Sequence, residues 1–298
     1  MAALRGRDVG AALPDVAILG SGAVGGLIGA VLTSAGTDTA LITREATAER
    51  LAREGLQISS PMFGERQVTV TARPQLTEPA GTLIVAVKAP HLPAALQRID
   101  AEPDVVVSLL NGVEHLGALR ERFGDRVVAA TVRVQAHRAA PTHVVHRAPF
   151  LTVAIADPGA PALAEALGAA RVEVLAGGSE TQVLWAKLSR LAALALATAA
   201  ADAPLGEVRP AAEAAAREVV TVANAEGAAL DPEAIIGELR GLPDAASSSL
   251  RADLAARTPD HELDAIGGAV LRAAARHGLP VPHTEALVAQ VATRAAEG

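Results

Sequence analysis

The chain has 298 residues, of which half are hydrophobic and 20% are charged, and its formal net charge is −7. This length suffices for two domains of about 100–150 residues each, and the composition is that of a packed globular protein rather than a fibrous or disordered one. The acidic balance, without any run of lysines or arginines, argues against nucleic acid as a partner. Because the chain has no cysteine, disulfides and thiolate chemistry are excluded.

The amino-terminal residues 1–14 lack the apolar core of a signal peptide, so we expect a flexible tail there. The longest nearly uncharged apolar helical stretch, Leu191 to Ala201, is shorter than the roughly 20 residues that a membrane crossing needs. The sequence therefore favours a cytoplasmic protein without a membrane partner.

Apolar runs and helical segments alternate in the first half of the chain. A run at residues 16–19 ends in glycine and is followed by helical sequence to Ala35. Runs at 39–43, 83–87 and 105–109 are followed by helical segments in the same way. Strands that alternate with helices predict a parallel sheet covered by helices on both faces.

Four further apolar runs predict strands that extend this sheet, at residues 127–131, 144–146, 151–155 and 172–175. Beyond Ala176-Gly177-Gly178-Ser179 the sequence becomes alanine-rich, with helical periodicity and almost no β-branched runs. We therefore predict an α/β fold with two domains. A Rossmann-type domain with a mostly parallel sheet covers residues 15–178, and an all-helical domain covers residues 179–298.

A glycine-rich motif follows the first predicted strand and opens a helix: Gly20-Ser21-Gly22-Ala23-Val24-Gly25. Gly20 permits a tight turn, Gly22 lets the backbone approach a pyrophosphate, and Gly25 allows the helix to pack closely on the strand. The helix N-terminus adds a partial positive charge. The position of the motif favours a dinucleotide-binding loop over an ordinary glycine-rich turn.

The end of the second predicted strand bears on the choice of nucleotide. A site for NAD usually has an acidic residue there, which binds the ribose 2′-hydroxyl. This chain has Thr43-Arg44-Glu45 instead. A guanidinium at Arg44 suits a 2′-phosphate and favours NADP, whereas Glu45 keeps NAD open, and a solvated arginine at a helix start is the plain alternative.

Only two of the 26 lysines and arginines are lysines, Lys88 and Lys187. Lys88 follows the predicted strand at 83–87, at the edge where open α/β sheets bind ligands. Lys187 lies on the apolar stripe of a predicted helix with Val183 and Leu191. If it is desolvated, its pKa falls toward the range useful for acid catalysis; otherwise the side chain extends to solvent.

Asparagine is equally scarce, with Asn111 and Asn224 alone. Asn111 follows the predicted strand at 105–109, so its amide is a candidate for binding cofactor or substrate, although Asn-Gly is also a common turn. The histidines His137, His143 and His146 have no carboxylates at metal-ligand spacing, and we expect no metal site.

The combination resembles the ketopantoate reductase (2-dehydropantoate 2-reductase) family over nearly the whole chain. The resemblance rests on the glycine motif together with Val87-Lys88-Ala89, Leu110-Asn111-Gly112-Val113, Leu184-Trp185-Ala186-Lys187-Leu188, Ser247-Ser248-Ser249-Leu250 with Asp253, His261-Glu262-Leu263-Asp264-Ala265-Ile266 and Gly278-Leu279-Pro280-Val281-Pro282.

The resemblance implies a helical domain like that of 6-phosphogluconate dehydrogenase, with NADPH and a 2-keto acid bound in the cleft between the domains, as in the pantothenate pathway. Lys187 matches the general acid, and Glu262 matches the acidic residue that arranges cofactor and substrate. The remaining matches are Lys88, Asn111 and Ala136 as cofactor contacts and Ser248 and Ser249 as substrate contacts.

One part of the family pattern is missing. The asparagines that hold the substrate in the family fall here on Leu191, Ala195 and Leu205. A site without these amides would bind a polar keto acid less tightly. Two alternatives therefore stand beside ketopantoate reduction: an NADP-dependent reductase or dehydrogenase for a more apolar ketone, imine or alcohol, and a catalytically silent NADP-binding sensor. The apolar helical domain also makes a homodimer plausible.

Overall fold

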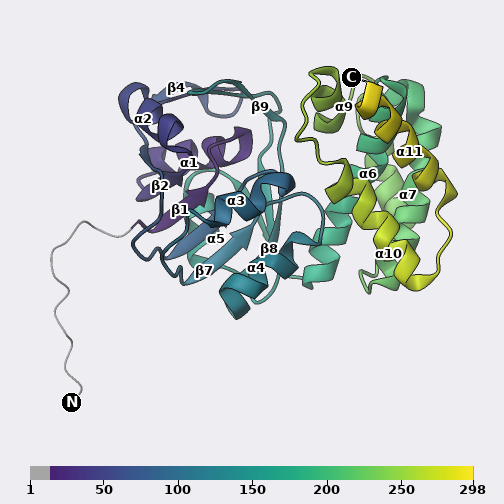
Figure 1. Ribbon diagram of the computed structural model, residues 1–298, viewed down its shortest axis with the longest axis horizontal. Coiled ribbons are helices and arrows are strands. Elements are labelled where there is room, and N and C mark those ends of the chain that lie inside the picture. The colour runs from purple at the N-terminus through teal and green to yellow at the C-terminus, as the bar shows by residue number, and fades with distance from the viewer. Residues whose placement is uncertain (1–13, 298) are drawn as a thin grey trace, which may run out of the picture.

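A computed structural model describes residues 14–297 and divides into an α/β lobe and a helical lobe (Figure 1). The predicted tail at 1–14 lies, apart from Pro14, outside the described residues. The last strand of the α/β lobe ends at Ala176 and the first helix of the helical lobe begins at Glu180. The predicted α/β fold with a separate helical region is therefore confirmed.

The main sheet has the strand order β12-β11-β8-β7-β6-β1-β2-β5. All its neighbouring strands run parallel except the pair β8 and β11, which is antiparallel. Strands β1, β2 and β6 are buried along their whole length, which explains their continuous apolar sequence, because both faces of a parallel sheet are covered. The strands are β1 Val16–Leu19, β2 Thr39–Ile42, β5 Thr71–Arg73, β6 Thr82–Val85, β7 Val105–Ser108, β8 Val127–Arg133, β11 Thr152–Ile155 and β12 Glu173–Ala176.

Helices cover the two faces of this sheet in separate apolar layers. Helices α1 (Ala23–Ser34) and α5 (Pro161–Ala169) pack in the layer that contains Ile18. Helices α3 (Leu92–Leu96) and α4 (His115–Phe123) pack in the layer that contains Leu19. Helix α2 (Glu45–Glu54) contacts β5 at the sheet edge, and two short 3₁₀ turns are η1 (Ala89–His91) and η2 (Gly124–Arg126).

A second, four-stranded sheet has the order β4-β3-β10-β9 and lies over α1. Its strands are β3 Leu56–Ser60, β4 Gly64–Val68, β9 Ala136–Ala140 and β10 His143–His146. The prediction that the strand at 144–146 extends the main sheet is therefore wrong. Strand β10 instead pairs with β3 and β9, and Val144 packs against Gly26 of α1.

The helical lobe is built around α6 (Glu180–Ala201), which packs against α7 (Leu205–Ala225), α8 (Pro232–Arg240), α9 (Ser249–Ala255) and α11 (Pro282–Glu297). The π-helical turn η3 (Asp264–Gly268) continues into α10 (Ala269–His277). Of the described helices, α6 alone has the length and composition of a membrane span, and 72% of the apolar stretch concerned is buried inside the protein. Trp185 of α6 is 2% exposed and belongs to the core of the helical lobe.

Candidate active site

The glycine motif forms the turn between β1 and α1. Gly20 has a φ of +106°, which favours glycine, and a side chain on Gly25 would overlap the carbonyl oxygen of Gly20. Gly22 precedes the first turn of α1 and faces open space. The free backbone N–H groups of this turn, at Ala23 and Val24, therefore offer an anion site, and the residues present fit a dinucleotide pyrophosphate.

The end of β2 lies beside this glycine loop. The hydroxyls of Ser21 and Thr43 are 2.8 Å apart, and the N–H of Gly20 donates to the carbonyl of Ile42. Arg44 follows directly as the residue that precedes α2, and its side chain is exposed. The loop and Arg44 are thus held next to each other, as a binding site for the adenosine half of NADP requires.

Two neighbouring strands, β6 and β7, bring Lys88 and Asn111 to the same edge of the sheet. The Nζ of Lys88 lies 2.8 Å from an oxygen of Asp253, so this lysine forms an ion pair across the cleft with the helical lobe. The amide nitrogen of Asn111 donates to an oxygen of Glu262 at 2.8 Å. Both predicted cofactor residues therefore lie at the lobe junction.

Glu262 is only 8% exposed and is held from the α/β lobe. Besides the amide of Asn111, the backbone N–H of Ala89 donates to its second oxygen at 3.4 Å. The turn that carries Asn111 also presses on the helical lobe, because a side chain on Gly112 would overlap the carbonyl oxygen of Ala265. These contacts fix the position of the carboxylate relative to the sheet.

Lys187 lies two turns into α6 and is partly buried. The helix begins with a capping hydroxyl, Ser179, and Glu180 in its first turn pairs with Arg120 of α4. The pKa of Lys187 is lowered to about 8, chiefly by burial; the negative charge of Glu262 acts in the opposite direction, and the positive charge of Arg190 adds to the lowering. An amine with this pKa can both hold and release a proton near neutral pH.

His115 was missed by the sequence analysis. It is the first residue of α4, it is 8% exposed, and neither ring nitrogen has a hydrogen-bond partner among the described residues. Burial and the nearby charge of Lys187 lower its pKa to about 4, so the ring is neutral at physiological pH. Nothing in the sequence around His115 distinguishes it from a surface histidine, so only the packing of α4 shows that it is buried.

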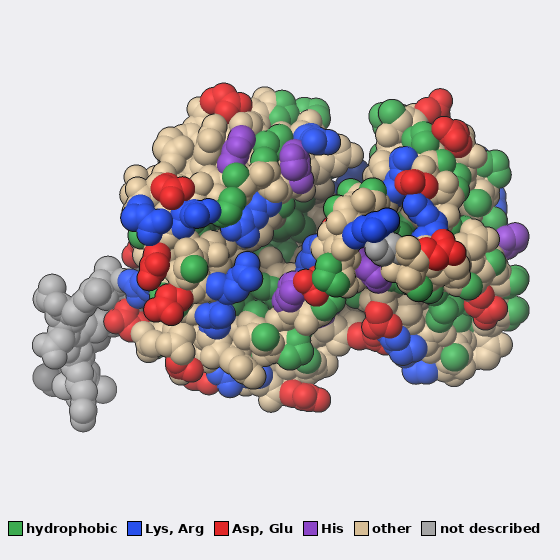
Figure 2. All heavy atoms as spheres, turned by 45° about the horizontal axis from the view of Figure 1, so that its top comes forward, with side chains coloured by type: hydrophobic (Ala, Val, Ile, Leu, Met, Phe, Trp, Pro, Cys, Tyr) green, Lys and Arg blue, Asp and Glu red, His purple; other side chains and the backbone are tan. Residues whose placement is uncertain are grey.

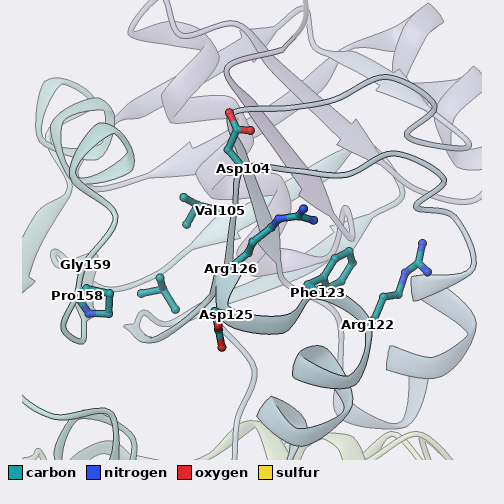
Figure 3. A pocket seen from close by; sticks show the side chains of 9 residues that line it. Asp104, Val105, Arg122, Phe123, Asp125, Arg126, Pro158 and Gly159 are labelled. Carbon is teal, nitrogen blue, oxygen red and sulfur yellow. The ribbon is translucent and has the colours of Figure 1, made fainter.

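The surface is hollowed between the two lobes (Figure 2). Lys88 and Asn111 follow the carboxyl ends of β6 and β7 and pair with Asp253 and Glu262 of the helical lobe. A different hollow, of about 540 Å³, lies at the amino ends of β7 and β8 and is lined by residues that include Asp104, Phe123 and Arg126 (Figure 3). Ligands of parallel sheets bind at the carboxyl edge, so the interlobe cleft is the candidate site. Within residues 14–297, no group of three or more histidine, aspartate or glutamate side chains could hold a metal ion.

Comparisons with known proteins match both lobes. The model of the ketopantoate reductase PanE/ApbA family matches residues 16–157, and that of its C-terminal domain matches residues 181–295. The chain belongs to the ketopantoate reductase family. The 2-dehydropantoate 2-reductase of Mycobacterium tuberculosis is 30% identical over 285 residues, which are 92% of this chain and 95% of that protein.

Solved structures give the same result. A ketopantoate reductase of this family from Ralstonia eutropha JMP134 is 30% identical, with a TM-score of 0.84 and coverage of 95% of this chain and 98% of that one. A D-mandelate dehydrogenase with NADH and anilino(oxo)acetate shares the fold at 20% identity, with a TM-score of 0.85 and coverage of 95% and 98%. The chain is thus an NADP-dependent oxidoreductase of the ketopantoate reductase family.

In this ketopantoate reductase family member, the predicted substrate positions differ in accessibility. Leu191 is partly buried, one turn beyond Lys187, whereas Ala195 and Leu205 are completely buried in the helical core. Ser248 caps α9 and lies 2.9 Å from the hydroxyl of Thr198. Ser249 is exposed, and Ala136 begins β9 and is partly buried. Of the three positions at which the family has asparagine, only Leu191 is not fully buried.

Proposed function

We propose that the protein reduces the carbonyl of a 2-keto acid to a hydroxyl with NADPH, as in the conversion of 2-dehydropantoate to pantoate. The observation that carries this proposal is the amine of Lys187, whose pKa is about 8 and whose charge interacts with Glu262 at the interlobe cleft. NADPH, when bound, supplies the hydride. The glycine loop, Arg44, Lys88, Asn111 and Ala136 are the proposed contacts of the cofactor.

Lys187 acts as the general acid in this proposal. Its Nζ donates a hydrogen bond to the carbonyl oxygen and transfers a proton to it as the carbonyl carbon gains the hydride, which leaves a neutral amine to be reprotonated from solvent. Glu262, oriented by Asn111 and Ala89, holds Lys187 and the substrate in place. Ser248 and Ser249 are the proposed substrate contacts from the start of α9.

Replacing Lys187 with alanine tests the proposal. The turnover of NADPH with 2-dehydropantoate should fall by about 10²–10⁴-fold, because positioned general acids contribute that much. The dissociation constant of NADPH, measured by fluorescence titration, should change less than about twofold, since Lys187 is proposed to contact the carbonyl of the substrate and not the cofactor. A wild-type protein that binds NADPH but turns over no member of a 2-keto acid panel would contradict the proposal and favour a sensor.

A second candidate function is the reduction of a more apolar ketone or imine, or the oxidation of a more apolar alcohol. It is favoured by Leu191, which places an apolar side chain one turn from Lys187 where the family has an amide donor. The D-mandelate dehydrogenase that shares this fold was solved with anilino(oxo)acetate, which carries an aromatic ring. Leu191→Asn should lower the KM for 2-dehydropantoate and raise it for phenylglyoxylate; an equal effect on both would contradict this alternative.

We propose further that the protein is a cytoplasmic homodimer. The support is a hollow of about 280 Å³ between α6, α7 and α11, lined by mostly apolar side chains that include Ala201, Val208 and Leu287. Light scattering coupled to size-exclusion chromatography measures the molar mass directly. A mass near 30.1 kDa, that of one chain, would contradict the dimer.

A further inference from the structure

We infer that Arg138, on β9, is the second arm of a two-arginine site that binds the 2′-phosphate of NADPH together with Arg44. The inference rests on the proposed function, because it concerns the cofactor of that reaction. It assigns to the small four-stranded sheet a role in choosing between NADPH and NADH. Among the described residues, Arg138 carries the only cation that the face of β9 toward α1 offers to this site.

Arg44 is held at the glycine loop by the strand that precedes it. The hydroxyl of Thr43 lies 2.8 Å from that of Ser21, and the backbone of β2 bonds to Gly20. Arg44 has an extended backbone before α2 and an exposed side chain. Its guanidinium is thus available to a group bound at the loop.

The strand pairing fixes the direction of Arg138. Strand β9 runs antiparallel to β10, and Arg138 lies directly opposite Val144. Directly opposed residues of an antiparallel pair project from the same face of the sheet. Val144 is buried against Gly26 in the first turns of α1, so Arg138 also projects toward α1. Ala136, the predicted cofactor contact, is two residues earlier and shares this face.

The charges around Arg138 indicate an anion. Its guanidinium is partly buried and donates to the carbonyl of Pro141 at 2.9 Å. Burial lowers the pKa of Arg138, and the positive charge of Arg44 lowers it further, as expected for two cations on the same side of α1. Within residues 14–297, neither arginine has a carboxylate within ion-pair distance. An anion bound between Arg44 and Arg138 would supply a counter-charge to both guanidinium groups.

A phosphate monoester is the ligand that suits this pair. Guanidinium groups bind phosphate through parallel N–H···O bonds, and a 2′-phosphate carries close to two negative charges. The ribose of a nucleotide on the glycine loop ends next to the second strand of a Rossmann fold, which here leads into Arg44. NADH has a hydroxyl at the same position, so it gains nothing from either arginine.

The test is the affinity of Arg138→Gln for both nucleotides, measured by fluorescence titration of the purified full-length chain. The dissociation constant of NADPH should rise about tenfold, as expected for the loss of one charge-assisted hydrogen bond, while that of NADH changes less than about twofold. Arg44→Gln should have the same selective effect. The double variant should bind the two nucleotides equally. Without nucleotide, Arg138→Gln should melt no lower than wild type, because the substitution removes a repulsion.

Arg66→Gln is the matched control, because Arg66 is exposed on β4, the opposite edge strand of the same sheet. It should leave both affinities unchanged. Equal weakening of NADPH and NADH in Arg138→Gln, or an unchanged NADPH affinity, would overturn the inference while leaving the proposed reductase intact. A wild-type protein that binds neither nucleotide would overturn the proposed function and this inference together.

Discussion

Burial and Glu262 act in opposite directions on the pKa of Lys187. The ammonium form donates the proton in the reductive direction, so the rate should be highest below the pKa of about 8 and fall as the pH rises through it. Glu262→Gln removes the charge that raises this pKa. The midpoint of the pH profile of kcat/KM should therefore move below about 8 in this variant.

The pH profile separates this electrostatic effect from a general loss of activity. Asp260→Asn is a suitable control, since Asp260 lies two residues earlier in the chain and its exposed carboxylate lies 3.2 Å from the Nε2 of His91. It should keep the wild-type midpoint. A Glu262→Gln variant with a lower rate and an unmoved midpoint would mean that the carboxylate positions groups without tuning the amine.

His115 makes stability depend on pH. Its pKa is lowered from 6.5 to about 4 in the folded protein, so between these values the unfolded chain binds the proton more readily. Its contribution to the free energy of unfolding is present above pH 6.5 and is lost as the pH falls toward about 4. His115→Asn should flatten this part of the pH dependence of urea unfolding, by roughly 1–3 kcal/mol over the interval.

The exposed residue His283 provides the comparison. His283→Asn should unfold with the pH dependence of the wild type. If His115→Asn behaved in the same way, the buried ring would have a partner that lets it ionise normally.

At the scale of elements, the turn between β7 and α4 joins the two lobes. Gly112 has a φ of +85°, and a side chain there would overlap the carbonyl oxygen of Ala265 at η3. Gly112→Ala should lower the free energy of unfolding by about 1–3 kcal/mol, because it combines a strained backbone with a clash. It should also lower kcat, since the same turn carries Asn111 to Glu262.

Gly117 is the matched glycine, in the exposed part of α4 with nothing within contact distance of an added side chain. Gly117→Ala should stabilise the protein by about 0.5–1 kcal/mol, because alanine favours a helix interior. Thermal and urea unfolding of the two variants measure the difference. A destabilised Gly117→Ala variant would mean that α4 is under constraints beyond those at its start.

The sequence predicted the main sheet better than the small one. Strands β1, β2, β6 and β7 are buried on both faces and read as continuous apolar runs. Strand β4 was missed because most of its residues are exposed, and β10 was found but placed in the wrong sheet. A short apolar run does not identify its partner strand. In β3, the alternation of buried Leu56, Ile58 and Ser60 was a usable signal.

The candidate site was predictable where local sequence determines geometry. The glycine loop needs only its own residues, so its conformation followed from the motif. The neighbourhood of Glu262 and Asn111 came from the family resemblance, because residues so far apart in the chain meet only through the packing of the lobes. His115 and Arg138 have ordinary sequence surroundings, and only the pairing of elements shows what they face. The domain boundary at 178 and 179 stays a prediction.

At the scale of the whole molecule, polar contacts join the two lobes beside the apolar contact that Leu184 of α6 makes with the core of the α/β lobe. Arg272 of the helical lobe pairs with Glu114 of the α/β lobe and with Asp264 beside it. Arg272 and Glu114 are nearly half exposed and Asp264 is more exposed still, so Arg272→Ala should cost no more than about 1 kcal/mol of unfolding free energy. Hydrogen exchange should nevertheless become faster in peptides around residues 110–118 and 260–270, because the lobes separate more often.

Arg276 tests whether this effect belongs to the lobe junction. It lies one turn later on α10 and pairs with Glu226 inside the helical lobe. Arg276→Ala should have a similar effect on stability but leave exchange around residues 110–118 unchanged. Faster exchange there in both variants would place the coupling in the fold of α10 rather than in the ion pair.

The two lysines of the chain, Lys88 and Lys187, both lie at the cleft between the lobes, which has a practical consequence. Apart from the amino terminus of the chain, Lys88 and Lys187 carry its only primary amines. Reductive methylation with isotope-labelled formaldehyde would thus introduce reporter methyl groups at the cleft and nowhere else along the side chains. Two well-separated resonances would then follow ligand arrival, lobe movement and proton release in solution, without any engineered label.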